Sequence, residues 1–350
     1  MSLGNGPLDQ KQLGEAHLSD RSLLDPPPPG LRARFKPGFD RRALLTIDTE
    51  EEFDWSKPFT PSGHKVDHLM RIGKFQEFCE GMGVVPVYLV DWPVVSSDLA
   101  KEVFPPLVAN GRAEIGVQLH PWVNPPQRET VNARNSYAGN LPPDLEREKF
   151  DNLVDAIEQN LGVSPLIYRA GRYGVGSETA AILKGRGIAI DTSVRPHHDY
   201  SDDGGPDFTR HPDYPYWTDE QRNLLEIPLT TCYWGMLRKQ GAMLQPLIRK
   251  FPGLGGALAK TGMLERIPLT PEGTTSEEAI RCIDIALDDG FELLVISLHS
   301  PSLVPGHTPY VRCEDDLDAL YGWMRAVYGY FSLRGVKPTS VGEIMHQVEV

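Results

Sequence analysis

Short apolar runs alternate with longer helix-like segments from residue 41 onward. Seven runs rich in Val, Ile and Leu are spaced along the chain: Ala43–Ile47, Val84–Val90, Ile115–Leu119, Leu166–Tyr168, Ile188–Ile190, Leu224–Leu229 and Leu293–Leu298. Such runs are typical of parallel strands whose faces are covered by helices. The alternation therefore predicts an α/β fold with a parallel sheet.

Five of the intervening segments have the periodicity and end signals of helices. They cover residues 66–81, 144–161, 177–184, 276–290 and 314–333. Between Asp144 and Leu161 the apolar residues recur roughly on one face, and Gly162 follows as a stop signal. Neither a repeat nor a break in composition marks a second domain, so we expect one domain over residues 41–350.

Residues 1–40 have a different character. They are polar, lack a sustained period and contain four consecutive prolines from Pro26 to Pro29. Such a run favours an extended, solvated backbone. We expect this segment to be a leader, extended or partly disordered, that contributes little to the core.

Composition and charge narrow the class of protein. The 350 residues are 40% hydrophobic and carry a formal net charge of −13, which disfavours nucleic acid as a partner. No apolar run approaches the ~20 residues that span a bilayer, so no membrane span is expected. The four cysteines are far apart and the first twenty residues lack a secretory h-region. These features predict a cytoplasmic protein with reduced thiols.

Ionisable side chains follow six of the seven predicted strands. In chain order these are Asp48, Asp91, His120, Arg169, Asp191 and His299. In a parallel β/α barrel the carboxyl ends of the strands meet on one face, where catalytic groups sit. The pattern therefore predicts a site with chemistry at that face.

An acidic cluster begins at Asp48. Five carboxylates occur between Asp48 and Asp54, an arrangement that either binds a cation or remains a solvated acidic loop. Gln118 and His120 alternate with Leu119 and point to one side of their strand, where with an acidic group they could form a mixed N/O metal site.

The other strand-end residues suggest acid–base chemistry. Arg169 could pair with Asp48 across the barrel mouth and keep that carboxylate ionised, or the pair could be purely structural. Asp191 and His299 supply a second carboxylate and an imidazole. A carboxylate bonded to an imidazole is a common way to prepare a general acid.

Five motifs in order resemble those of the polysaccharide deacetylase (NodB-homology, carbohydrate esterase) family. They are T-x-D-x-E from Thr46, E-I-G-x-x-x-H-P from Glu114, Y-R-A-G-R-Y-G from Tyr168, D-T-S from Asp191 and L-H-S from Leu298. The resemblance spans residues 42–300 and implies a distorted (β/α)7 barrel. It also implies Asp48 as general base, Arg169 as the residue that orients it, Asp191 as the residue that tunes the catalytic histidine, and His299 as general acid.

The same resemblance implies a divalent metal, expected to be Zn²⁺, with an altered ligand set. Thr49 stands where the family has a metal-binding aspartate, and Glu50 is the nearest substitute. Gln118 stands where we align the first of the family's two histidines, and Trp122 where the second would fall. The candidate ligands are therefore Glu50, Gln118 and His120.

A long polar and aromatic segment, residues 195–217, follows the fifth predicted strand. Loops at this position border the active site, and exposed aromatic and acidic side chains suit sugar binding, although the loop could equally pack its own aromatics. The candidate substrate-binding residues are Trp122, Arg172, Tyr173, His198 and Asp207.

These observations together predict a hydrolase of carbon–nitrogen bonds. It would remove an acyl group, most plausibly acetyl, from an N-acylated sugar or glycan precursor. Two alternatives stay open: a metal-independent amide or cyclic-amide hydrolase acting on a small non-sugar molecule, and a barrel with a decayed site that binds a sugar.

Overall fold

The computed structural model describes residues 21–54, 56–251 and 253–350, and its centre is a curled parallel sheet. The parallel strands are β1 (Arg41–Thr49), β2 (Val87–Val90), β3 (Glu114–Leu119), β4 (Ile167–Ala170), β5 (Ile190–Asp191), β7 (Leu225–Glu226) and β10 (Leu293–His299). Their spatial order is β10-β1-β2-β3-β4-β5-β7. All seven predicted strands are therefore confirmed, as is the distorted barrel.

The edges of the sheet carry shorter strands. β6 (Tyr216–Trp217) pairs antiparallel with β7, and β11 (Val336–Pro338) pairs in parallel with the beginning of β1. Between β7 and β10 the barrel is not closed by a strand ladder. The side-chain oxygen of Thr230 instead accepts a hydrogen bond of 2.8 Å from the backbone N–H of Val295.

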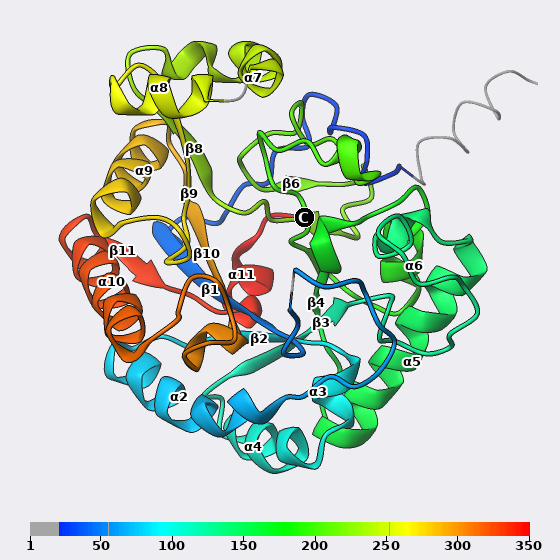
Figure 1. Ribbon diagram of the computed structural model, residues 1–350. Coiled ribbons are helices and arrows are strands. Elements are labelled where there is room, and N and C mark those ends of the chain that lie inside the picture. Colours follow the sequence, from blue (N-terminus) through cyan, green and yellow to red (C-terminus); the bar gives the residue numbers. More distant parts are fainter. Residues whose placement is uncertain (1–20, 55, 252) are drawn as a thin grey trace, which may run out of the picture.

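Helices surround the sheet as an outer ring (Figure 1). They are α2 (Ile72–Gly81), α3 (Trp92–Ser96), α4 (Asp98–Ala109), α5 (Pro143–Leu161), α6 (Thr179–Gly185), α9 (Ser276–Asp288) and α10 (Glu314–Leu333). The five predicted helices are among them, with a 3-10 turn (Asp67–Arg71) preceding α2. α4 was not predicted because Pro105 and Pro106 lie inside it, and proline usually ends a helix.

Alternation along the strands separates two layers of core. On β1, Leu45 and Ile47 belong to the apolar layer beneath the helices, whereas Leu44 belongs to the layer inside the barrel. Thr46 and Asp48 have the same parity as Leu44, because successive side chains of a strand point to opposite faces. The strand that fills the barrel thus also directs Asp48 into its mouth.

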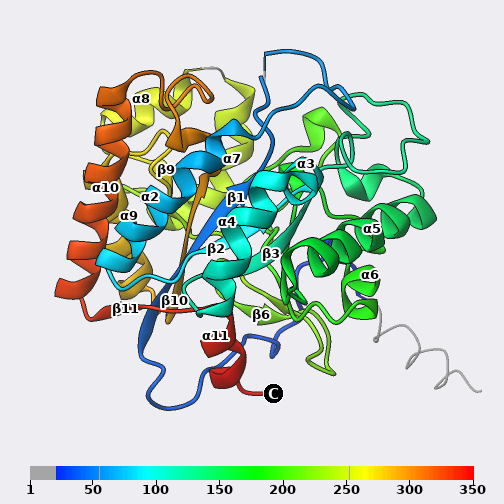
Figure 2. The same cartoon turned by 90° about the horizontal axis from the view of Figure 1, so that it is seen from below.

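The base of the barrel is closed by residues 31–39 and by α11 (Val341–Gln347). Leu31, Phe35 and Phe39 are buried in the inner apolar layer together with Ile344 of α11. The expectation that the leader contributes little to the core is wrong for this part, because these apolar side chains cover the open end of the sheet. Residues 1–20 of the expected leader lie outside the described residues. In Figure 2, α11 lies at the end of the barrel opposite the loop that follows β1.

A small lobe stands apart from the ring. It is formed by α7 (Gly241–Lys250) and α8 (Leu254–Lys260) within residues 235–264, which connect the antiparallel pair β8 (Thr231–Trp234) and β9 (Glu265–Pro268). The sequence patterns did not predict this lobe. No helix in the described part of the chain is long and apolar enough to cross a membrane.

Candidate active site

A cavity of about 360 Å³ opens at the carboxyl ends of the strands. Its lining includes most of the side chains expected to act there: Asp48, Glu50, Gln118, His120, Arg172, Tyr173 and His299. Asp48, Gln118 and His299 meet because they lie on strands with inward parity, Glu50 and His120 directly follow such strands, and Arg172 and Tyr173 come from the turn after β4. The predicted convergence of β1, β3 and β10 on one site is therefore present.

Asp48 is held by Arg169 at the floor of this site. The Arg169 guanidinium donates from Nη1 to Asp48 Oδ1, and from Nη2 to the hydroxyl of Thr46 at 2.8 Å. Its Nε donates to the backbone carbonyl of Thr192 at 3.1 Å. Arg169 is fully buried, so the carboxylate is the countercharge that its burial requires. The arrangement fixes the orientation of Asp48, and the predicted pair of Asp48 with Arg169 is present.

His299 is paired with a carboxylate that the sequence did not single out. Its Nδ1 lies 2.6 Å from Glu272 Oε2, and its backbone N–H donates to Glu272 Oε1 at 3.1 Å. Burial lowers the pKa of His299, but the charges of Glu272 and Glu50 outweigh it and raise that pKa well above its usual value. The neighbouring carboxylates therefore favour the imidazolium form of His299. Its Nε2 lies 3.8 Å from Asp48 Oδ2.

Asp191, expected as the partner of His299, interacts elsewhere. Its Oδ1 accepts a 2.6 Å hydrogen bond from the hydroxyl of Ser193, and its carboxyl interacts with that of Glu226. Burial raises the pKa of both groups, and the Asp191 charge raises the pKa of Glu226 further. Protonation is therefore favoured at Glu226 in this buried pair. Asp191 lies on β5, which is separated from β10 by four strands along the sheet, and Glu272 takes the place beside His299.

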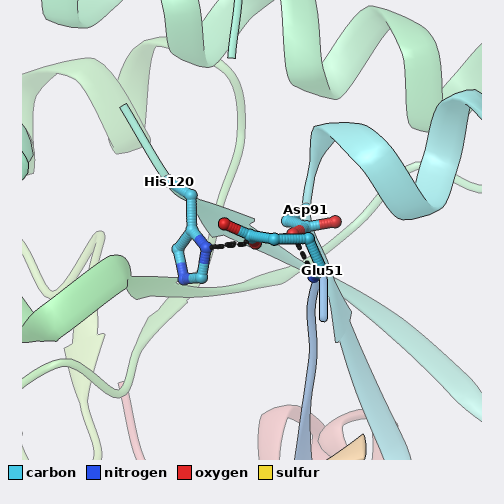
Figure 3. Close-up of side chains that lie close together, drawn as sticks. All are labelled: Glu51, Asp91 and His120. Atoms are coloured by element: carbon cyan, nitrogen blue, oxygen red, sulfur yellow. Dashed lines mark hydrogen bonds and ion pairs between the residues drawn. The ribbon is translucent and has the colours of Figure 1, made fainter. Parts of the chain in front are cut away.

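His120 is fixed by a carboxylate on the side away from the cavity. Figure 3 shows its Nδ1 directed at Glu51, which it meets at 2.8 Å, with Asp91 beyond. The indole N–H of Trp122 donates to the other oxygen of Glu51 at 2.7 Å. Burial raises the pKa of Glu51, but His120 and Asp91 outweigh it and lower that pKa to about 2. Burial and the Glu51 charge raise the pKa of Asp91, which is therefore the protonated member.

Two groups of side chains near His120 have the composition of a metal site. Ligand atoms of Glu51, Asp91 and His120 lie within 4.8 Å of one another. Their oxygens are already used, since Glu51 accepts from His120 and Trp122, and Asp91 accepts from the backbone N–H groups of Glu51 and Val94. This group is better described as the hydrogen-bonded support of His120 than as the cation site.

Glu50, Gln118 and His120 fit a metal on the cavity side. Glu50 Oε2 lies 3.4 Å from both His120 Nε2 and Gln118 Nε2, and Gln118 Oε1 is buried without a hydrogen-bond partner among the described residues. The separation of Glu50 Oε2 and His120 Nε2 is roughly that of two ligand atoms bound to Zn²⁺ at about 2.0–2.2 Å. The Gln118 Nε2 contact is a hydrogen bond donated to Glu50, and Oε1 is the atom of that amide that can coordinate a metal. The Nδ1 contact of His120 with a carboxylate is the usual support of a metal-binding imidazole. Burial raises the pKa of Glu50 to about 7, and a cation would favour its ionised form.

The residues expected to bind substrate divide into two groups. Arg172 and Tyr173 line the cavity. Trp122 is buried behind His120, on whose ring it stacks at 4.3 Å, so it does not reach the cavity. His198 is buried and bonds the carbonyl of Pro196 through Nδ1, and Asp207 is exposed and caps the backbone N–H of Thr209. Neither lines the cavity.

Further lining residues were missed by sequence reasoning. They are Tyr137, Arg195, Tyr200, Asp203 and Tyr310. Arg195 and Tyr200 belong to the polar segment after the fifth strand, which was expected to border the site. Glu272 and Tyr310 come from loops after β9 and β10 and carry no local pattern that distinguishes them from other loop residues.

Comparison with known proteins agrees with this architecture. No family model and no curated protein matches the sequence. Among solved structures, a protein from Parabacteroides distasonis described as a glycoside hydrolase/deacetylase has a TM-score of 0.52 at 11% identity, over 88% of this chain and 70% of that one. The allantoinase PuuE has a TM-score of 0.50 at 14% identity, over 89% and 91% of the two chains.

A protein from Mycobacterium smegmatis described as a polysaccharide deacetylase covers more of both chains. It is 17% identical over 91% of this chain and 98% of its own, with a TM-score of 0.47. The two structures with TM-scores of 0.52 and 0.50 share the barrel fold that the five motifs predicted for this chain.

Proposed function

We propose that this protein is a hydrolase that removes an acyl group, in the first instance acetyl, from the nitrogen of an N-acylated sugar or glycan precursor. The observation that carries the proposal is the pairing of Asp48 with Arg169 and of His299 with Glu272 on one cavity. One pair presents a carboxylate bound to a guanidinium, and the other presents an imidazole whose protonated form is favoured by a carboxylate. Amide hydrolysis needs that combination, a base for water and an acid for the departing amine.

Asp48 is the base in this mechanism. Arg169 occupies Oδ1, which leaves Oδ2 free to accept a proton from a water molecule in the cavity. The water attacks the acyl carbon while Asp48 takes up its proton. Arg169 holds the carboxylate in place through this charge-assisted hydrogen bond.

His299 is the acid. Glu272 fixes the Nδ1 side of the ring, so Nε2 is the atom directed towards Asp48 and the cavity. When the carbon–nitrogen bond breaks, Nε2 donates its proton to the departing amine. Glu272 then stabilises the ring orientation for the next cycle.

Glu50, Gln118 and His120 are the residues that would hold a divalent cation, with Zn²⁺ as the first candidate. Such a cation supplies polarisation of the acyl oxygen and acidification of bound water. Gln118 contributes a neutral amide oxygen, a weaker zinc ligand than imidazole. The ligand set therefore favours a loosely held metal.

The test is acetate release from N-acetylglucosamine oligomers and N-acetylated nucleotide sugars by the full-length protein. We expect Asp48→Asn and His299→Ala each to lower turnover by roughly 10²-fold or more. Asp40→Asn and His346→Ala, on exposed residues at the other end of the barrel, are matched controls that should keep activity. Absence of acetate release from every acylated sugar, with the folded protein verified, would contradict the proposal.

A second function keeps the barrel and dispenses with the metal. Gln118 in place of an imidazole, together with the fold shared with an allantoinase, favours hydrolysis of a small cyclic amide. A chelator distinguishes the two, because only a metal-dependent enzyme loses activity and regains it with added zinc. Activity on hydantoin-like rings that survives the chelator would establish this alternative.

A further inference from the structure

One side of the cavity is lined by arginine and tyrosine side chains, in contrast to the carboxylates and histidines that form the proposed catalytic site. Arg195 and Arg172 line it together with the rings of Tyr173 and Tyr200. The guanidinium of Arg195 lies 5.2 Å from the centre of the Tyr173 ring and donates to the Tyr200 hydroxyl at 3.2 Å. Two positive charges thus border a cavity in a strongly acidic protein.

Arg195 has no carboxylate countercharge among the described residues. No carboxylate among them lies within 4.0 Å of Arg195 or of Arg266, whereas Arg172 has Asp203, which also lines the cavity, at 3.9 Å. Burial and the charge of Arg195 lower the pKa of Arg266. Arg169, by contrast, is fully paired with Asp48.

Arg195 also has unused hydrogen-bonding capacity. A guanidinium carries five N–H donors, and within the described chain Arg195 uses one of them, towards Tyr200. Unpaired, partly buried arginines with free donors are suited to carboxylate and phosphate oxygens, which they bind with paired, charge-assisted hydrogen bonds.

We infer that the Arg195 side of the cavity binds an oxyanion, a carboxylate or a phosphate, carried by the substrate. The inference rests on the proposed function in that the oxyanion is attached to the acylated sugar. The substrate class is therefore an acidic or phosphorylated N-acyl sugar. The anion anchors it at Arg195, and the acyl group reaches Asp48 and His299.

The first experiment tests the oxyanion site without any sugar. Inorganic phosphate and acetate are titrated into the full-length protein while arginine side-chain N–H signals are followed by NMR. The Arg195 signal is assigned from Arg195→Gln, and Arg325→Gln, an exposed arginine on α10, is the control. We expect saturable shifts of the Arg195 signal with at least one anion. An unshifted Arg195 signal with both anions would overturn the inference.

The second experiment compares N-acetylglucosamine, its 6-phosphate and N-acetylmuramic acid by calorimetry. We expect the phosphate or the carboxylate sugar to bind about 10–100-fold more tightly than the neutral one. Arg195→Gln should remove that difference and leave the neutral affinity unchanged. If Arg195→Gln weakened the binding of all three sugars equally, the inference would be overturned. Anion binding without binding of any sugar would instead refute the glycan substrate and retain the oxyanion site.

A separate observation concerns the lobe, defined here as residues 235–264. It contains five Lys and Arg residues and no Asp or Glu, in a chain whose net charge is −13. Figure 1 shows its helices α7 and α8 outside the ring around the barrel. Lys239, Lys250 and Lys260 are exposed, and no carboxylate of the described chain lies within 4.0 Å of them.

The lobe also exposes large apolar side chains. Met236, Met243, Leu247 and Phe251 are exposed by 82%, 73%, 47% and 57%. They make up four of the ten exposed large hydrophobic residues of the described chain, within sixteen residues. Met243, Leu247 and Lys250 lie on α7, and the other exposed residues flank it or end α8. Exposed apolar side chains close in sequence to unpaired lysines are features of a segment that lies in a bilayer interface.

The lobe is attached next to the cavity. Arg249 of α7 is ion-paired with Asp199 and lies 3.5 Å from Asp202, on the segment that carries the cavity residue Tyr200. We propose that the lobe binds the surface of an anionic lipid bilayer. The lysines complement the lipid phosphates, and the Met, Leu and Phe side chains enter the boundary of the acyl chains. A bound membrane would then lie near the mouth of the cavity.

Sedimentation with vesicles tests this proposal. The full-length protein should bind vesicles of equimolar phosphatidylglycerol and phosphatidylcholine, and bind pure phosphatidylcholine far more weakly. Replacing Lys239, Lys250 and Lys260 by Gln should lower the partition constant roughly 100-fold, since each lysine near an anionic surface contributes about fivefold. Met243→Gln with Phe251→Gln should weaken binding as well. Met70→Gln with Leu333→Gln, on exposed residues elsewhere, is the matched control.

Three outcomes would overturn the membrane proposal. One is equal binding to neutral and anionic vesicles, and another is retention of binding by both lobe variants. The third is a dimer in light scattering that Met243→Gln with Phe251→Gln dissociates, without any vesicle binding. In that case the lobe contacts a second copy of the chain.

Discussion

His299 Nδ1 lies 2.6 Å from Glu272 Oε2, which makes Glu272 the group that controls the protonation of the proposed general acid. Glu272 is itself fixed, since the hydroxyl of Ser302 donates to its other oxygen at 2.5 Å. A carboxylate in this position favours the imidazolium form and sets the orientation of the ring. The role that the motif resemblance gave to Asp191 thus falls, in this chain, to a residue on the loop after β9.

Glu272→Gln should shift the pH dependence of turnover. Glu272 raises the pKa of His299, so its removal lowers that pKa, and the imidazolium is lost at a lower pH. The alkaline limb of the kcat profile should therefore move to lower pH, with reduced turnover at neutral pH and little change in KM. Asp191→Asn, which does not contact His299, should leave that limb in place. A shift of the limb in Asp191→Asn alone would contradict the assignment.

A buried glutamate between two helices should make stability depend on pH. Glu146 of α5 accepts a hydrogen bond of 2.5 Å from Thr179 of α6, and burial raises its pKa to about 7. The folded protein binds this proton more tightly than the unfolded chain. Its contribution is therefore complete below pH ~4.5 and is lost as pH rises through about 7.

Glu146→Gln should flatten this part of the pH profile. The substitution should remove at most about 3.4 kcal/mol of pH-dependent stability, because the pKa rises from 4.5 to about 7 and each step of one in pKa corresponds to about 1.36 kcal/mol. Urea unfolding at pH 5 and pH 8 measures it, and Glu102→Gln on α4 serves as the exposed control. An unchanged pH dependence in Glu146→Gln would show that Glu146 is already ionised in the folded protein.

The parts of the site that could be predicted from the sequence are those tied to strands. Asp48, Arg169 and His299 follow apolar runs whose alternation settles both their position and their direction. Their partners could not be found in that way. Glu272 lies on a loop and Glu226 on a two-residue strand, so neither has a periodic neighbourhood. Trp122 was wrongly expected to bind substrate, because the sequence does not determine which way a side chain points once the chain has left the strand. Its ring packs behind His120 and does not line the cavity.

Gly171 offers a test of how His120 is positioned. A side-chain carbon at Gly171 would lie 2.3 Å from Cδ2 of His120 and 2.6 Å from the carbonyl oxygen of Leu119, far closer than van der Waals contact. Gly171→Ala should displace the imidazole and weaken zinc binding, by roughly 10–100-fold if the site acts as proposed. Zinc titration with a chromophoric competitor measures the change. Gly73→Ala on α2, where the added carbon meets nothing within 4 Å, should bind zinc normally.

The packing of the leader against the base of the barrel gives a last prediction. Phe39 is 1% exposed, stacks on Phe35 with ring centres 4.1 Å apart, and belongs to the inner apolar layer that α11 completes. Phe39→Ala should lower the free energy of unfolding by about 3–5 kcal/mol, because the shorter side chain leaves a cavity in this buried apolar layer. Met70→Ala, at a residue 71% exposed, should have almost no effect.

Urea unfolding of the two variants gives the comparison, and equal stabilities would show that residues 31–39 contribute nothing to the fold. Because Phe39 lies at the end of the barrel opposite the cavity, turnover of the folded Phe39→Ala protein should remain within a few-fold of the parent.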